Sequence, residues 1–137
     1  MGQAPLVIDE IEAGKAFIER MNSYSPVAGA AWIRPDEDGE RYLYVVLSNL
    51  ADENTDAAYM DVWRVVNELK DQHYVDPFRV RVIGPNDPFA RGITEIYRRY
   101  PGRIPSGYNS SDFPGQAVVD AYIYPRIVSK AAPVPPR

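Results

Sequence analysis

The sequence has no cysteine and only one histidine, His73, among its 137 residues. Without cysteine there is no disulfide, no thiolate ligand for a metal and no cysteine nucleophile. A single imidazole leaves no histidine pair for zinc. Within Asp71-Gln72-His73-Tyr74 it is better explained as a cation at the end of a helix than as a catalytic base, because no activated nucleophile stands beside it in the sequence. The acidic residues of 36–40 lack the carboxylate that an EF-hand loop has at its twelfth position and are better explained as a solvated hairpin turn than as a cation site, so we expect no metal site.

Long apolar runs and glycine-rich motifs are also missing. No stretch approaches the ~20 apolar residues that a membrane-spanning helix needs, and the N-terminus has no basic region followed by an apolar segment. The sequence therefore predicts a cytoplasmic protein that does not enter a membrane. Neither of the common glycine-rich phosphate motifs is present, so we expect no cofactor.

The sequence does contain an ordinary globular composition with many tyrosines. Hydrophobic residues make up 45% and charged residues 25%, and ten Tyr stand against four Phe and two Trp. A chain of this length builds one hydrophobic core. A tyrosine ring buries apolar area but keeps a hydroxyl that needs water or a partner, so we expect many of these rings at the margin of the core or at an interface.

Charge is distributed unevenly along the chain. The formal net charge is −4, but residues 1–72 carry 14 acidic and 6 basic residues, whereas residues 73–137 carry 5 acidic and 9 basic ones. The pI near 5.0 argues against non-specific nucleic-acid binding. Binding of nucleic acid through a local basic face is therefore the least favoured functional hypothesis; its residues would be Arg79, Arg81, Arg91 and Arg98.

Hydrophobic periodicity divides the chain into seven elements. Apolar residues at helical spacing predict helices over residues 9–21 and 88–100, and a helix between them that is capped by Asn54 or Thr55 and frays at residues 71–74. Alternating apolar residues predict strands over residues 27–34, 41–47, 78–83 and 118–124. A short loop rich in turn-forming residues makes the first two strands an antiparallel hairpin, while a helix between two strands favours a parallel crossover.

The order α-β-β-α-β-α-β therefore predicts an α+β fold, with a mixed four-stranded sheet and helices packed mainly on one of its faces. A single domain spans residues 9–130. Residues 1–8 form an N-terminal extension, and the proline-rich residues 131–137 form a disordered tail.

Three details of this pattern predict which side chains are buried. The second helix presents an apolar face at spacings of three and four residues, made of Tyr59, Val62, Trp63, Val66 and Leu69. In the third strand Phe78, Val80 and Val82 share one side, and Arg79, Arg81 and Ile83 share the other. Residues 28–31 of the first strand are alanine and glycine only, which predicts that another element lies close on top of them.

The most unusual stretch runs from Arg98 to Asp112, from a basic helix end into a long loop. Arginine forks, hydroxyl groups and glycines together are able to hold a phosphate or carboxylate. This stretch supports the hypothesis of a small enzyme or ligand-binding protein for an anionic compound; the candidate residues are Arg98, Arg99, Arg103, Tyr108 and Asn109. The alternative is that Arg98 and Arg99 only complement the helix dipole and that the rest are ordinary loop residues.

The favoured hypothesis is a non-catalytic interaction module that forms a homo-oligomer or joins a larger assembly. Strands that alternate Leu or Val with Tyr have two faces to cover, and helices on one face leave a tyrosine-lined face for a second copy or another protein. The expected interface residues are Tyr42, Tyr44, Tyr122 and Tyr124. The oppositely charged halves of the chain favour the same association, as a homodimer about a two-fold axis.

Overall fold

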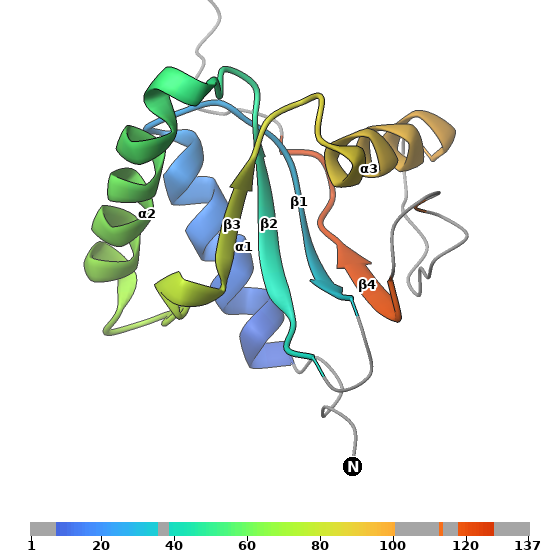
Figure 1. Ribbon diagram of the computed structural model, residues 1–137. Helices are drawn as coiled ribbons and strands as arrows, with labels where there is room; N and C mark the ends of the chain where they lie inside the picture. The colour runs from blue at the N-terminus through green and yellow to red at the C-terminus, as the bar shows by residue number, and fades with distance from the viewer. Residues whose placement is uncertain (1–7, 36–38, 101–112, 114–117, 128–137) are drawn as a thin grey trace, which may run out of the picture.

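The computed structural model describes residues 8–35, 39–100, 113 and 118–127. It has the predicted α+β architecture (Figure 1). The elements in chain order are α1 (Ile8–Asn22), β1 (Val27–Arg34), β2 (Tyr42–Leu47), the 3₁₀ turn η1 (Asp52–Asn54), α2 (Thr55–Leu69), the 3₁₀ turn η2 (Pro77–Arg79), β3 (Val80–Ile83), α3 (Pro88–Arg99) and β4 (Asp120–Ile123). The predicted extension is described only at residue 8, where α1 begins, and the predicted tail lies outside the described residues.

The four strands form one mixed sheet in the order β3-β2-β1-β4. β1 runs antiparallel to both β2 and β4, and β2 runs parallel to β3 across the connection made by α2. Both parts of the topological prediction are therefore confirmed: the hairpin is antiparallel, and the strands joined by a helix are parallel. As a result the carboxyl ends of β2, β3 and β4 lie at the same end of the sheet.

Two helices cover one face of the sheet and one helix covers part of the other (Figure 1). α1 and α2 pack side by side on the first face, on side chains that include Trp32, Leu43, Val45, Val80 and Val82. α3 packs on the opposite face, on side chains that include Ala31, Ile33, Val46, Ala121 and Ile123. The prediction that helices lie mainly on one face is therefore confirmed.

The close approach predicted over residues 28–31 is found between β1 and α3. A methyl group placed at Gly29 would lie 2.9 Å from Tyr97 Cε2 and 3.0 Å from Ile93 Cγ2. Both contacts come from α3, so the missing side chain at this position is what lets the helix settle onto the strand. The Tyr97 hydroxyl then donates a hydrogen bond of 2.7 Å to the Tyr124 carbonyl, which fixes the helix to the end of β4.

Two predicted core residues are wrong. Trp63 is 50% exposed and Phe78 is 75% exposed. The core face of α2 is instead made of Ala58, Val62, Val65 and Val66. Phe78 lies in η2 and not in a strand, because the Asp76 carboxylate accepts a hydrogen bond from the Phe78 N–H and turns the backbone before β3 begins.

Candidate functional site

The four tyrosines predicted to line one interface lie on opposite faces of the sheet. Tyr42 and Tyr44 pair with Ile33 and Ala31 on the α3 side, whereas Tyr122 and Tyr124 pack on the α1 side. The premise of a single tyrosine-lined face is therefore wrong. On the α3 side Tyr44 packs against Phe89, with ring centroids 4.8 Å apart, and burial raises the pKa of the Tyr44 phenol. The Arg81 guanidinium carbon lies 4.4 Å from the Tyr42 ring centroid.

The predicted anion site is described only in part. Arg98 and Arg99 end α3, and both contact the Glu95 carboxylate on the same helix. Hydrogen bonding by Arg98 lowers the pKa of Glu95. The two guanidinium groups are thus already shared with a carboxylate one turn away, as expected of a basic helix end. The other three candidates, Arg103, Tyr108 and Asn109, lie outside the described residues.

A charged cluster closes the end of the sheet where β1 finishes and where β2 and β4 begin. Arg34 Nη2 lies 2.7 Å from Asp120 Oδ2, and buried Arg41 Nε lies 3.5 Å from Asp120 Oδ1. Arg79 Nε donates to the Arg41 carbonyl at 3.1 Å and pairs with Glu40 at 3.2 Å. These contacts join three strand ends and the η2 turn, so the cluster is accounted for as a structural element.

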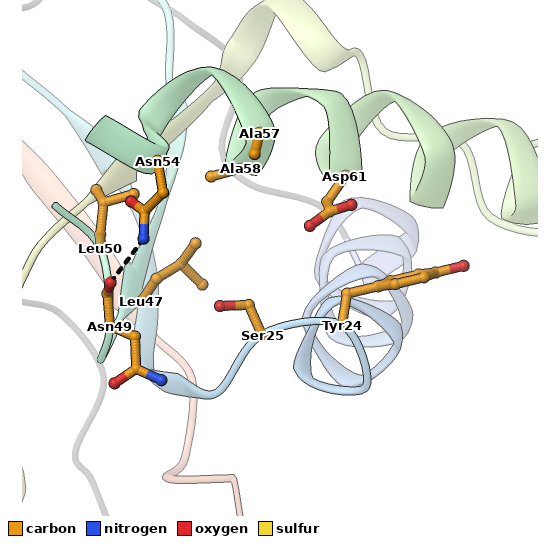
Figure 2. A pocket seen from close by; sticks show the side chains of 9 residues that line it. All are labelled: Tyr24, Ser25, Leu47, Asn49, Leu50, Asn54, Ala57, Ala58 and Asp61. Atoms are coloured by element: carbon orange, nitrogen blue, oxygen red, sulfur yellow. Dashed lines mark hydrogen bonds between the residues drawn. The ribbon is translucent and has the colours of Figure 1, made fainter. Parts of the chain in front are cut away.

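A pocket of about 130 Å³ lies between the end of α1, the end of β2 and the first two turns of α2 (Figure 2). Its apolar lining is made by Leu47, Leu50, Ala57 and Ala58. Figure 2 shows the Ser25 hydroxyl and the Asp61 carboxylate both directed into the space beside Leu47. The pocket therefore combines apolar side chains with a small number of polar groups, as small-ligand sites commonly do.

One wall of this pocket belongs to a polar network that joins α1 to α2. Arg20 Nε donates to Glu68 Oε1 at 2.7 Å, and the Tyr24 hydroxyl donates to the same carboxylate. These two donors, Arg20 first, lower the pKa of Glu68. The guanidinium carbons of Arg20 and Arg64 lie 5.1 Å and 5.4 Å from the Tyr24 ring centroid. The network links α1 and the residue Tyr24 to α2 beside the pocket.

An apolar surface lies on the opposite flank of α2. Met60 is 66% exposed, Trp63 50% and Phe78 75%. The Trp63 and Phe78 rings meet edge to face, with centroids 5.3 Å apart and planes at 87°. We call Met60, Trp63 and Phe78 the α2–η2 surface. From the sequence we assigned Trp63 and Phe78 to the core and did not single out Met60. The buried face of α2 is formed without these three residues.

The part of the chain that the structure describes holds no cluster of three or more His, Asp or Glu side chains placed to bind a metal ion. Within the same residues no helix is long and apolar enough to cross a bilayer. Comparison of the chain with protein-family models, with curated proteins and with solved structures gives no match.

Proposed function

We propose that this protein is a non-catalytic interaction module that docks a partner protein on the α2–η2 surface. The observation that carries the proposal is the exposed pair of Trp63 and Phe78, stacked edge to face with Met60 exposed nearby on α2. Tryptophan, other aromatics and methionine are enriched at protein interfaces, and tryptophan is among the residues that most often dominate binding energy. Apolar side chains grouped on one surface favour burial against a partner.

The α2–η2 surface is large enough to form the centre of an interface. Aromatic side chains bury ~150–250 Å² each when covered, so the exposed fractions of these three residues amount to roughly 300–400 Å² of side-chain area. That is the size of the largest apolar patch on a typical monomer, and such patches are often functional. Covering it contributes on the order of 8–10 kcal/mol before the costs of association are subtracted.

The neighbouring sheet edge has no free backbone donor in β3 for an added strand. Because backbone groups alternate in direction along a strand, Val80 and Val82 present their N–H groups away from β2. The Val80 N–H donates to the Pro77 carbonyl, and the Val82 N–H donates to the Tyr59 hydroxyl at 3.0 Å. Both donors on this side of β3 are occupied by the protein itself, which is how edge strands are protected from unwanted pairing. A partner therefore docks through side chains.

Charge indicates what kind of partner fits. The elements α1, η1, α2 and η2 together carry nine acidic and four basic residues, whereas α3 carries three basic and one acidic. A second copy docked about a two-fold axis at α2 would bring two acidic layers together, which opposes association. We therefore propose a foreign partner whose apolar cluster is surrounded by lysine and arginine.

The test is site-specific photocrosslinking in cells. A photoreactive phenylalanine analogue replaces Met60 in the full chain, and a matched chain carries it at Arg91, an exposed position on α3. We expect an adduct with one basic protein from position 60 only. The same adduct should disappear when Trp63→Ser is added, while thermal unfolding of the Trp63→Ser protein stays cooperative because the ring is half exposed.

Sedimentation of the purified wild type and of Trp63→Ser separates the alternatives. A monomer in both cases is expected. A wild-type homodimer that dissociates on Trp63→Ser would contradict the foreign partner and assign the surface to a second copy. A homodimer that dissociates on Tyr44→Glu instead would support the α3-side tyrosines as the interface. Equal crosslinking from positions 60 and 91 would remove the proposal altogether.

A further inference from the structure

The pocket beside Ser25 and Asp61 is independent of the α2–η2 surface. In α2, Ala57 and Asp61 face α1, whereas Met60 and Trp63 point to the other flank of the helix. The volume of about 130 Å³ is close to that of cavities of ~150 Å³ that accept benzene. The pocket therefore has room for a compound, or the end of a side chain, of about five or six heavy atoms.

The lining contains one charged side chain, the carboxylate of Asp61. Its Oδ1 pairs with Arg64 Nη1 at 3.2 Å, a contact between neighbours on the exposed side of α2. Within the described residues Asp61 Oδ2, the Ser25 hydroxyl and the Asn49 side-chain amide form no hydrogen bond. The pocket thus offers a carboxylate and two neutral polar groups whose bonding capacity is unused.

These groups match an ammonium ion better than an anion. An alkylammonium head has three N–H donors and no acceptor, and the carboxylate, hydroxyl and amide oxygens all accept. The N-terminal dipole of α2 favours an anion, but Asp52, Glu53 and Asp56 at and before its first turn oppose that field. A phosphate or carboxylate ligand would meet Asp61 without any cation in the lining.

We propose that this pocket binds an alkylammonium group of three or four carbons, with its chain on Leu47, Ala57 and Ala58 and its nitrogen at Asp61 and Ser25. Two sources carry this group: a free small amine, or the lysine side chain of a protein. The chain of a lysine, four methylenes and an ammonium, fits the same volume.

The test is a titration of the ¹⁵N-labelled full chain with n-butylammonium chloride, followed by amide chemical shifts. We expect shifts confined to the pocket, at Ser25, Asn49, Asn54 and the amides of Ala57 and Ala58, with a millimolar Kd, as suits five heavy atoms. Butyrate and 1-butanol have nearly the same size and shape as n-butylammonium, but butyrate is negatively charged and 1-butanol is uncharged. They should bind at least tenfold more weakly.

Variants locate the effect. Asp61→Asn should weaken n-butylammonium at least tenfold, while Asp56→Asn, an acid of the same helix outside the pocket, should change the Kd less than twofold. Ala57→Leu should abolish binding by filling the space, and Arg64→Gln should strengthen it by releasing Asp61. The amide spectrum of each variant reports whether its fold is retained.

A second titration distinguishes the two sources. A blocked peptide with a single lysine that binds at the same amides more tightly than n-butylammonium identifies a protein lysine, and weaker binding identifies a free amine. Equal binding of butyrate, or an unchanged Kd in Asp61→Asn, would overturn the proposal.

Discussion

The strongest test of the fold concerns a buried polar contact between β1, β4 and α1. Trp32 Nε1 donates to the Tyr124 hydroxyl at 2.9 Å, and that hydroxyl donates to the Ile11 carbonyl at 2.7 Å. Trp32 is 4% exposed and Tyr124 is 2% exposed, and burial raises the pKa of the Tyr124 phenol. One hydroxyl therefore satisfies two groups that water reaches poorly.

Tyr124→Phe keeps the ring and removes only this hydroxyl. The Trp32 N–H is then left buried without an acceptor, which costs about 1–3 kcal/mol. The Ile11 carbonyl also loses the hydroxyl as a partner, but it lies within α1, so it adds less to the destabilisation than the Trp32 N–H does. We expect a loss of about 2–3 kcal/mol in the free energy of unfolding, and a fall of the melting midpoint on the order of 10 °C.

Gly14 in α1 makes room for the same hydroxyl. In an exposed helix, alanine in place of glycine adds about 1 kcal/mol of stability. Here a methyl group at residue 14 would fall on the Tyr124 hydroxyl oxygen and lie 2.9 Å from Trp32 Nε1. We therefore expect Gly14→Ala to destabilise the protein by about 1–3 kcal/mol, as overpacking of a core does.

The two changes together form a double-mutant cycle. Without the hydroxyl the worst overlap is gone, although Trp32 Nε1 remains close, so Gly14→Ala should cost at least about 1 kcal/mol less in Tyr124→Phe than in the wild type. The measurement is urea unfolding followed by circular dichroism, with equal m-values in all four proteins. Strictly additive costs, or a wild type stabilised by Gly14→Ala, would refute the contact between α1 and β4.

Three further predictions follow from burial and charge. Val66→Asp should abolish cooperative unfolding, because it places an unpaired charge on the core face of α2. Arg81→Glu changes an exposed residue and should leave unfolding cooperative. A circular dichroism melt in which Val66→Asp unfolds like the wild type would contradict this. Asp120→Asn removes the only carboxylate that contacts buried Arg41 within the described residues. Because Asp120 is 40% exposed, solvent screens part of the loss, so we expect a cost of about 1–3 kcal/mol in urea unfolding, which an unchanged free energy of unfolding would disprove. Burial raises the pKa of Tyr97 from 10.0 to about 12. The stability that its neutral phenol contributes is therefore present below pH 10 and is lost as pH rises through 12. The free energy of unfolding of Tyr97→Phe should fall less over that interval than that of the wild type, and equal falls in the two proteins would contradict this.

Much of the fold was predictable because it depends on local periodicity and turn chemistry. Three helices, four strands and both strand directions follow from the spacing of apolar residues and the length of the connections. The predicted third strand was too long, because residues 77–79 form a turn before β3. The sequence signal was present: Asp76-Pro77-Phe78 repeats as Asp87-Pro88-Phe89, and each aspartate accepts a hydrogen bond from the phenylalanine N–H at 2.9 Å.

The candidate sites were less predictable, because periodicity reports spacing but not which of two adjacent stripes faces the core. Trp63 stands between Val62 and Val65, and a bulky apolar residue there was counted with the buried stripe. The small side chains of Ala58 and the three valines complete that stripe unaided. The pocket joins Tyr24 and Ser25, which follow α1, to residues between 47 and 61 at the end of β2, in η1 and in α2, so no single local pattern reveals it.

Periodicity also leaves open which face of the sheet each tyrosine occupies, whereas the uneven charge along the chain reappears in the fold. Alternation placed Tyr42 with Tyr44, and Tyr122 with Tyr124, but only the pairing of β1 with both β2 and β4 decides that the two pairs face opposite ways.

The acidic first part of the chain, in contrast, supplies both α1 and α2, so charge that differs along the sequence becomes charge that differs across the sheet. A basic partner is then drawn to the α1–α2 side at a rate that falls with salt, while the apolar contact at Trp63 is little affected. Salt dependence confined to the association rate would therefore separate the two contributions to docking.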